Sequence, residues 1–254
     1  GDVGAQDMML GALTCPFGTG HMGVTAENVA RECGVTREAQ DAFALESQVR
    51  AARAIAEGRF KDQIAPIMVK SRKGEVAFDT DEHPKATSLE ALAGLRPAFD
   101  KAGTVTAGNA SGINDGAGAV VLARADAAEA AGLKPRARVV GYAVAGVRPE
   151  VMGIGPIPAV EALLKRTGLS VADFDVIESN EAFAAQALAV NAGLGLDPAR
   201  VNPNGGAIAL GHPVGATGAI VTVKAMYELE RIGGRYGLIT MCIGGGQGIA
   251  LAIE

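Results

Sequence analysis

The feature that most constrains the fold is a predicted alternation of strands and helices along the second half of the chain. Short apolar runs, typical of strands, occupy 138–145, 175–178, 236–242 and 248–253. Helical patterns separate these runs at 158–167, 181–192 and 214–231. Such alternation is typical of a layered α/β domain with a mixed sheet. The 254 residues are enough for one large or two ordinary domains.

The first quarter of the chain predicts helices, and the next 40 residues do not predict a domain. Two helices are expected within 25–57, the first opened by Thr25 and the second capped by Thr36. The pattern of residues 60–101 indicates an extended insertion without a hydrophobic core of its own. They predict a short strand at 64–69, a segment at 75–78 that pairs back onto it, and a short helix at 88–93.

One predicted strand has no obvious partner. The small apolar run at 118–122 predicts a buried strand, and a helix is expected at 125–131, ending at Gly132. A buried strand needs neighbours to satisfy its backbone hydrogen-bonding groups. We therefore expect this strand either to join the later sheet or to be completed by segments outside this chain.

Composition favours a folded protein of the cytoplasm. Hydrophobic residues make up 48% of the chain and charged residues 20%, which predicts a sizeable core. The net charge of -5 argues against non-specific nucleic-acid binding, so an anionic substrate would need a local basic patch. The odd number of cysteines, without CxxC spacing, suits reduced thiols. No apolar run is long enough to span a bilayer and no signal peptide opens the chain.

The 35 glycines are clustered, and two clusters frame reactive side chains. His212 lies between Gly211 and Pro213 in a glycine-rich loop before a helix, a frame that fixes the ring and leaves space around it. A histidine titrates near neutrality and can act as a base, although a lone histidine is often structural. Cys242 precedes three consecutive glycines between two strands. The backbone N–H groups there could bind an oxyanion, or the thiol could be a small buried hydrophobe before a hairpin.

Three further segments are candidates with equally plain alternatives. Asn180, at a strand-to-helix junction, is either an N-cap or a group that holds a water or a substrate carbonyl. Residues 106–116 lack helical or strand periodicity and form either a ligand-lining loop or a surface loop. The Gly20–Gly23 turn with His21 lines a pocket or is merely a turn. A group of basic residues is either a solvated face or a phosphate contact: Lys70, Arg72, Lys73, Lys85, Arg96 and Lys101.

Together these motifs resemble the thiolase family, most closely its bacterial acetyl-CoA acetyltransferase and broad-specificity β-ketothiolase branch. The matching blocks follow the family's order and span nearly the entire chain. They are GHMGVTAENVA, LRPAFD, GTVTAGNASGINDGAGAVVL, VMGIGPIP, NEAFAAQ, NPNGGAIALGHPVGATGA and CIGGGQGIA. The resemblance implies Claisen condensation of two acyl-CoA molecules, or thiolysis of a 3-ketoacyl-CoA, by ping-pong chemistry.

The resemblance also implies roles for individual residues. His212 matches the histidine that activates the nucleophilic cysteine and helps to form an oxyanion hole, and Cys242 matches the acid/base cysteine. Asn180 matches the residue that holds a water in the first oxyanion hole, and Gly244 a backbone donor of the second. Residues expected around the coenzyme A thioester are Leu13, His21, Met22, Lys85, Ala107, Ser111, Met152 and Phe183. Lys85 stands where relatives often carry an arginine, which keeps the charge but loses the fork geometry.

The family's nucleophilic cysteine has no counterpart in these residues. It lies in an N-terminal half, on a turn that opens a helix, and neither Cys15 nor Cys33 has that setting. The resemblance therefore implies a thiolase-like layered α/β/α fold with a mixed five-stranded sheet and an incomplete first half. Residues 1–101 are expected to be the inserted loop domain, 102–136 the closing strand and helix of the N-terminal half, and 137–254 the C-terminal half.

The implied partners are acyl-CoA or coenzyme A and further copies of the chain, as a homodimer or homotetramer, with neither nucleic acid nor membrane. No metal and no cofactor beyond coenzyme A thioesters is expected. A non-catalytic CoA-binding or assembly module derived from a thiolase is the main alternative. A condensing enzyme of the polyketide type is disfavoured because that group uses a second histidine where this chain has Cys242.

Overall fold

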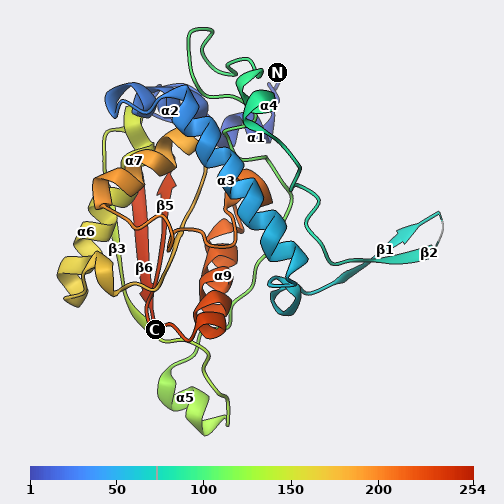
Figure 1. The fold of residues 1–254 in the computed structure, drawn as a ribbon, viewed down its shortest axis with the longest axis vertical. Coiled ribbons are helices and arrows are strands. Elements are labelled where there is room, and N and C mark those ends of the chain that lie inside the picture. Colours follow the sequence, from blue (N-terminus) through green and yellow to red (C-terminus); the bar gives the residue numbers. More distant parts are fainter. Residues whose placement is uncertain (73) are drawn as a thin grey trace.

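The computed structural model describes residues 1–72 and 74–254, and it has a layered α/β core from which two appendages project (Figure 1). Lys73, in the predicted basic turn, lies outside the described residues. The first half contains α1 (Met8–Ala12), α2 (Met22–Glu32), α3 (Arg37–Ala56), a 3-10 turn (Lys61–Gln63), β1 (Ile67–Ser71), β2 (Gly74–Phe78), α4 (Leu89–Ala93) and α5 (Ala125–Ala130). The second half contains β3 (Val139–Gly146), two 3-10 turns (Pro149–Ile154 and Val171–Asp173), α6 (Pro156–Thr167), β4 (Val176–Ser179), α7 (Ala184–Leu194), α8 (Ala207–Leu210), α9 (Thr217–Ile232), β5 (Gly237–Ile243) and β6 (Gln247–Ile253).

The central sheet is mixed, as predicted, with strand order β3-β6-β5-β4. β4 and β5 run parallel, whereas β6 pairs antiparallel with both β3 and β5. Alternate residues of each strand point to opposite faces. Ile177 and Leu238 pack with α6 in one apolar cluster, whereas Val176 and Ile239 pack with α9 in another. Helices therefore cover the sheet from both sides, and this confirms the α/β/α layering.

The expected fifth strand is reduced to a single bridge beside β4. Ile177 N donates to Arg200 O at 2.9 Å, and Asn202 N donates to Ile177 O at 2.8 Å. Asn202 then turns to a φ of 44°, and Pro203 has no N–H with which to continue a ladder. The Asn202 side chain instead bonds the backbone N–H and C=O of Ser179. Among the described residues the sheet thus has four strands and not five.

The predicted buried strand at 118–122 is wrong for this structure. These residues form neither strand nor helix, and Val121 and Leu122 are 91% and 80% exposed. Gly116 and Gly118 lie against Pro213 and Ile220, so the segment runs beside the α9 region without a strand partner. Among the described residues the sheet has the order β3-β6-β5-β4, so the segment does not join it, which excludes the first of the two outcomes expected from the sequence. The helix predicted after it is present as α5, on a projecting arm (Figure 1).

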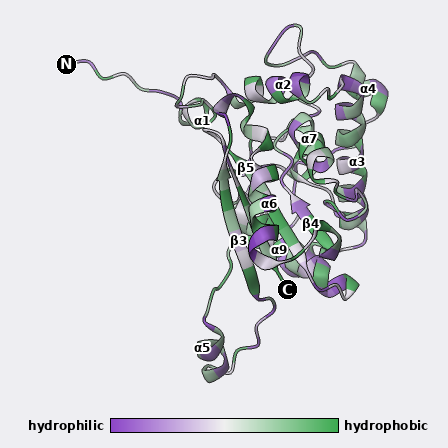
Figure 2. Cartoon of the chain, turned by 90° about the vertical axis from the view of Figure 1, so that its left-hand side faces the viewer, coloured by the Kyte–Doolittle hydropathy of each residue, from purple (hydrophilic) through white to green (hydrophobic). Residues whose placement is uncertain are grey.

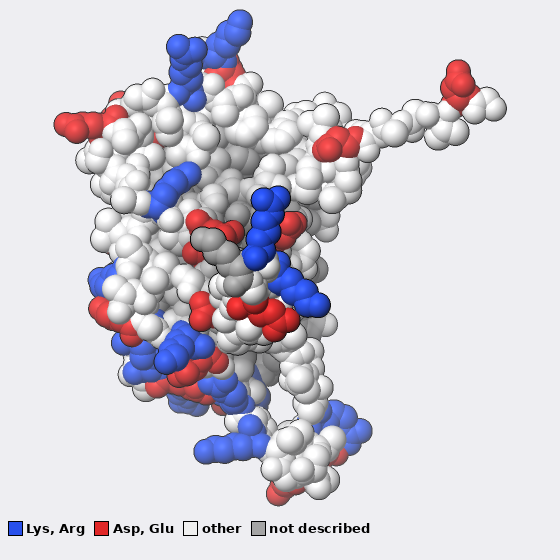
Figure 3. Space-filling model, turned by 90° about the vertical axis from the view of Figure 1, so that its right-hand side faces the viewer, with Lys and Arg blue, Asp and Glu red and all other residues white. Residues whose placement is uncertain are grey.

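The sheet face that carries α9 is covered only in part. Tyr142 and Val144 of β3, on this face, are 56% and 66% exposed. The hydropathy-coloured cartoon draws much of β3 in green, so most residues of this edge strand are apolar (Figure 2). The β1–β2 hairpin also projects from the body with all its described side chains exposed (Figure 1). On the face shown in Figure 3, basic and acidic side chains are interspersed.

The first helical region begins earlier than the sequence suggested. α2 starts at Met22 rather than near Thr25, because the His21 ring caps it: Gly23 N donates to His21 Nδ1 at 3.0 Å. The predicted cap of α3 is confirmed, since Ala39 N donates to Thr36 Oγ1. α3 crosses the molecule diagonally (Figure 1) and contacts α7, which follows Asn180 in the chain, and α8, which precedes His212.

Candidate active site

His212 is held in a narrow position by the residues around it. Its backbone N donates to Gly112 O at 3.2 Å, and its ring Nδ1 lies 2.6 Å from Thr217 Oγ1. Gly211 has a φ of 94°, and a Cβ there would overlap the Asn114 amide, so only glycine fits before the histidine. Burial lowers the pKa of His212, which favours a neutral imidazole near pH 7.

Asn180 directly faces this histidine from the end of β4. Its Nδ2 lies 3.4 Å from His212 Nε2, and its backbone N donates to Thr240 O in β5. The N-cap alternative does not hold, because α7 begins at Ala184 and Phe183 occupies its cap position. Asn180 Oδ1 is buried without a hydrogen-bond partner among the described residues. That oxygen is therefore free to bind a further donor.

Cys242 lies near the end of β5, at the edge of the sheet where β4 also ends. Ser179 pairs with Thr240 in the parallel register, so Asn180 and Cys242 both lie just beyond this pair. This edge is the usual site of ligands in open α/β sheets. The thiol is 8% exposed, and burial raises its pKa to about 12. The group therefore remains a protonated thiol in this setting.

An apolar cluster surrounds the thiol, and it contains four of the residues expected around the thioester. Cys242, Met22, Met152 and Phe183 are buried together, and Leu13 packs against them. A Cβ at Gly244 would lie 3.3 Å from Met22 Sδ, so the turn after β5 directly contacts this cluster. The His21 ring stacks on Phe99, with centroids 4.9 Å apart, and Phe99 meets Phe183 edge-on.

The loop at 106–116 connects these motifs to one another. Ser111 N donates to Ala182 O, and Ala110 forms a bridge with Phe183. The loop thus touches the Asn180 segment on one side and His212 on the other. Ala107, within the same loop, is exposed. Lys85 is exposed as well, and its backbone N donates to Gln48 of α3.

Buried carboxylates hold this loop in place. The Glu27 carboxylate accepts from the backbone N of Thr104 and Val105, and Asp41 accepts from Asn109 Nδ2. Asn109 Oδ1 in turn accepts from Thr106 N at 2.8 Å. Backbone donors satisfied by side chains explain why the segment has neither helical nor strand periodicity.

Three residues at the site were not named individually from the sequence, although Asn114 and Thr217 lie in blocks that the sequence singled out. Thr217 contacts the His212 ring, Asn114 Oδ1 is 3.4 Å from the His212 N, and the His83 ring lies 3.4 Å from Asn114 Nδ2. Thr217 lies five residues after the histidine on the helix that follows, which is the one pattern that could have predicted it. His83 lies within residues 60–101, which the sequence predicts to have no core of their own, and only the tertiary fold brings it close to Asn114.

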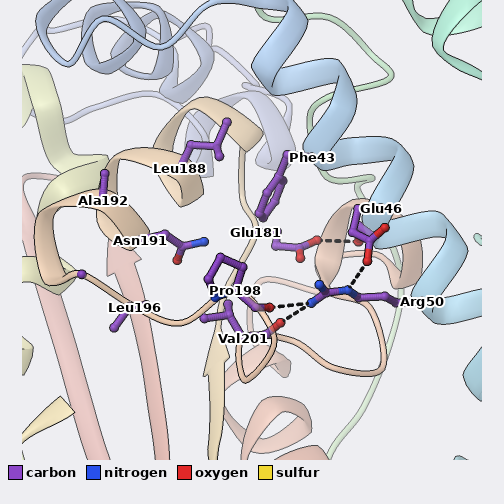
Figure 4. A pocket seen from close by; sticks show the side chains of 12 residues that line it. Phe43, Glu46, Arg50, Glu181, Leu188, Asn191, Ala192, Leu196, Pro198 and Val201 are labelled. Atoms are coloured by element: carbon purple, nitrogen blue, oxygen red, sulfur yellow. Dashed lines mark hydrogen bonds and ion pairs between the residues drawn. The ribbon is translucent and has the colours of Figure 1, made fainter. Parts of the chain in front are cut away.

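A separate cavity of about 470 Å³ lies between α3, α7 and the segment that follows α7 (Figure 4). Glu181 lines it and accepts from Ser47 and Asn202. Arg50 closes one side by donating to Pro198 O and Val201 O. Neither histidine nor cysteine lines this cavity, so the reactive groups belong to the sheet edge and not to it.

In residues 1–72 and 74–254, no group of three His, Cys, Asp or Glu side chains is placed to hold a metal ion. Within the same ranges, no helix has both the length and the apolar character needed to cross a membrane.

The chain has an α/β/α core in which a glycine-framed histidine, an asparagine and a cysteine lie at one edge of the sheet. Comparison with known protein families identifies the class to which this arrangement belongs. Residues 1–126 match the model of the thiolase N-terminal domain, and residues 133–254 match that of the thiolase C-terminal domain. The chain belongs to the thiolase family.

Individual relatives are similar over the full length of this chain. Beta-ketothiolase BktB of Cupriavidus necator is 62% identical over 100% of the chain and 65% of its own length, and the acetyl-CoA acetyltransferase of Escherichia coli is 56% identical with the same coverages. The crystal structure of human mitochondrial 3-ketoacyl-CoA thiolase matches at 49% identity with a TM-score of 0.97. A structure of that thiolase in complex with CoA matches with a TM-score of 0.95, covering 63% of it and all of this chain. The chain therefore spans about 65% of the length of these relatives.

Proposed function

We propose that the protein is an acyl-CoA C-acyltransferase that condenses two acyl-CoA molecules or cleaves a 3-ketoacyl-CoA with coenzyme A. The observation that carries the proposal is the meeting of four sequence motifs at one sheet edge. The loops of Ser111 and His212 hydrogen-bond to each other, and the Asn180 segment contacts both. Cys242 lies at the same edge, within an apolar cluster suited to the pantetheine and acyl group.

The proposed mechanism divides the work among these groups. The acyl group passes to a nucleophilic cysteine that is not among these 254 residues, and His212 Nε2 takes that thiol's proton. In thiolysis Cys242 gives its proton to the leaving acetyl-CoA carbanion, and in synthesis its thiolate removes the same α-proton. The high pKa of the buried thiol suits the donor role. Gly244 N–H and a water held by Asn180 stabilise the two oxyanions.

The residues that we propose to bind the acyl-CoA substrate are those implied by the resemblance to the thiolases. Leu13, Met22, Met152 and Phe183 would contact the acyl and pantetheine groups, and their shared cluster with Cys242 supports this. The remaining members would lie farther along the coenzyme: His21, Lys85, Ala107 and Ser111. We further propose that the protein uses no metal and no cofactor beyond coenzyme A thioesters, and that it is cytoplasmic. We also propose that the chain divides into a loop domain (1–101), the closing strand and helix of the N-terminal half (102–136) and the C-terminal half (137–254).

We also propose a homodimer or homotetramer. The exposed apolar side chains of the β1–β2 hairpin and of β3 support an assembly, because monomers seldom leave such surfaces uncovered. Size-exclusion chromatography with light scattering tests this. A monomer at micromolar concentration would contradict it.

The function is tested with a chimaera in which this chain is joined to the part of beta-ketothiolase BktB that it does not cover. Cleavage of acetoacetyl-CoA by coenzyme A is followed by loss of the enolate absorbance. We expect turnover by the chimaera, and at least a 10²-fold lower kcat for His212→Ala and for Cys242→Ala. Cys33→Ala, at an exposed helix end, is the matched control and should be fully active.

The non-catalytic alternative gives a different result. A folded chimaera that binds coenzyme A with no turnover would favour a CoA-binding or assembly module. The setting of the cysteines in this chain keeps that alternative open, since Cys15 is buried in the apolar cluster and Cys33 lies at the C-terminal end of α2. The 254-residue chain alone should show negligible turnover and, by mass spectrometry, no stable acyl adduct at Cys242 or Cys15.

A further inference from the structure

Thr217 makes two side-chain contacts at the first turn of α9. Its side chain is buried, and its Oγ1 lies 2.6 Å from His212 Nδ1. The same oxygen lies 2.9 Å from the backbone carbonyl oxygen of Pro213. The hydroxyl therefore stands between a ring nitrogen and a carbonyl, both belonging to the glycine-framed loop.

The number of available protons limits how these contacts can be made. A threonine hydroxyl has one proton to donate, and a carbonyl oxygen can only accept. When the hydroxyl donates to Pro213 O, its contact with His212 must be one in which Oγ1 accepts. Nδ1 then carries the imidazole proton, and Nε2 is left with its lone pair.

The other side of the ring agrees with this arrangement. Asn180 Nδ2, an amide donor, lies 3.4 Å from His212 Nε2. An N–H at Nε2 would face that donor, whereas a lone pair accepts from it. The two contacts, one on each ring nitrogen, are thus consistent with the same tautomer.

We infer that Thr217 is a positioning residue that fixes the tautomer of His212, holding its proton on Nδ1 so that Nε2 is the basic atom at the sheet edge. The catalytic meaning of this inference rests on the proposed function, whereas the tautomer itself is a property of the chain. In the proposed mechanism Nε2 must accept a thiol proton, and only the Nδ1–H tautomer leaves it able to do so. Thr217 would not touch substrate and would act only through His212.

Nitrogen NMR of the 254-residue chain tests the tautomer directly. The chain has three histidines, so long-range ¹H–¹⁵N spectra of ¹⁵N-histidine-labelled protein can be assigned with His21→Gln and His83→Gln variants. We expect wild-type His212 to show a protonated Nδ1 and an unprotonated Nε2 at pH 7.5. Thr217→Ser keeps the hydroxyl and should keep that pattern. Thr217→Val keeps the shape, removes the hydroxyl, and should shift the ring toward the Nε2–H form.

A protonated Nε2 in the wild-type chain, or an unchanged ring in Thr217→Val, would overturn the inference. In the BktB chimaera, Thr217→Val should lower kcat roughly 10- to 100-fold with little change in KM and alter the pH profile, and Thr217→Ser should restore it. An active chimaera whose kcat and pH profile do not respond to Thr217→Val would overturn the inference alone. An inactive chimaera whose His212 tautomer still depends on Thr217 would count against the proposed function while supporting the inference.

Discussion

The buried ion pair between Lys224 and Glu178 offers the sharpest stability test, because it links β4 to the glycine loop before His212. Lys224 Nζ lies 2.8 Å from Glu178 Oε2 and donates to Gly205 O at 2.7 Å. The two side chains are only 6% and 1% exposed. Glu178 Oε1 has no hydrogen-bond partner among the described residues, so Lys224 is the main compensation for its charge.

Lys224→Met keeps most of the side-chain volume and removes the charge. Removing one partner of a buried pair costs about 3–5 kcal/mol, because the other charge remains buried without compensation. The matched control is Arg148→Met, which breaks the exposed pair with Glu32, where the two side chains are 65% and 47% exposed. An exposed pair contributes only about 0–1 kcal/mol. Urea unfolding followed by circular dichroism gives both free energies of unfolding.

The pH dependence has a definite sign. Burial raises the pKa of Glu178 above the ordinary glutamate value of about 4.3, and Lys224 opposes this rise. Without Lys224 the folded-state pKa is higher still, so the folded protein binds more protons than the unfolded chain above pH of about 4.3. Stability of the variant therefore falls as pH rises through that window. The deficit of Lys224→Met relative to wild type should be larger at pH 8 than at pH 5.

A second substitution separates charge from packing. Adding Glu178→Gln to Lys224→Met removes the uncompensated charge and should recover at least half of the lost stability. A loss in Lys224→Met no larger than that of Arg148→Met would refute the reasoning. So would a deficit that grows as the pH is lowered.

Three other predictions concern thiols, glycines and caps. Cys33 is exposed, whereas Cys15 and Cys242 are buried. A disulfide exchange reagent should therefore modify one thiol fast in the native chain and three thiols after unfolding. Cys33→Ser should lose the fast phase, which checks the assignment. Gly248→Ala should lower the free energy of unfolding by about 3 kcal/mol, because a Cβ there would overlap the Gly155 carbonyl. A Cβ at Gly215 faces open space, so Gly215→Ala should change the free energy of unfolding by less than about 0.5 kcal/mol. Thr36→Ala should cost about 1 kcal/mol by removing the cap of α3, and Thr36→Ser should not; equal melting temperatures for the two would contradict this.

Elements with local signals were predictable from the sequence. The strands β3 to β6 and the helices α6 and α9 follow apolar patterns, and both helices end at left-handed glycine caps, Gly168 and Gly233. The β1–β2 pairing and the Thr36 cap have equally local causes. Their side chains and turns determine them without reference to the rest of the chain.

Features that depend on distant partners were not predictable in this way. Residues 118–122 have the composition of a buried strand, yet they pair with no strand among the described residues, and Val121 and Leu122 are exposed. The fifth strand fails because Asn202 and Pro203 end the ladder after one bridge. His83 belongs to no motif, and only tertiary packing brings it to the His212 loop, whereas Thr217 lies in the same sequence block as His212 without a pattern that marks its ring contact.

The candidate site divides along the same line. The glycine frames of His212 and Cys242 singled these residues out, and resemblance to the thiolases added Asn180 and the residues of the apolar cluster. The sequence left the N-cap reading of Asn180 open, and the structure removes it because α7 begins four residues later. Glu27 and Asp41, whose carboxylates hold the start of the 106–116 loop, were identified only from their contacts in the structure.

The most direct measurement of the central claim is methyl NMR of the ¹³C-methionine-labelled chain titrated with coenzyme A. Met22 and Met152 share the buried cluster with Cys242, whereas Met68 lies on the projecting hairpin and Met226 packs against the opposite helical layer. Saturable shifts of Met22 and Met152, with Met68 and Met226 unmoved, are the predicted result. Saturable binding that leaves Met22 and Met152 unchanged would place the coenzyme elsewhere and contradict the account.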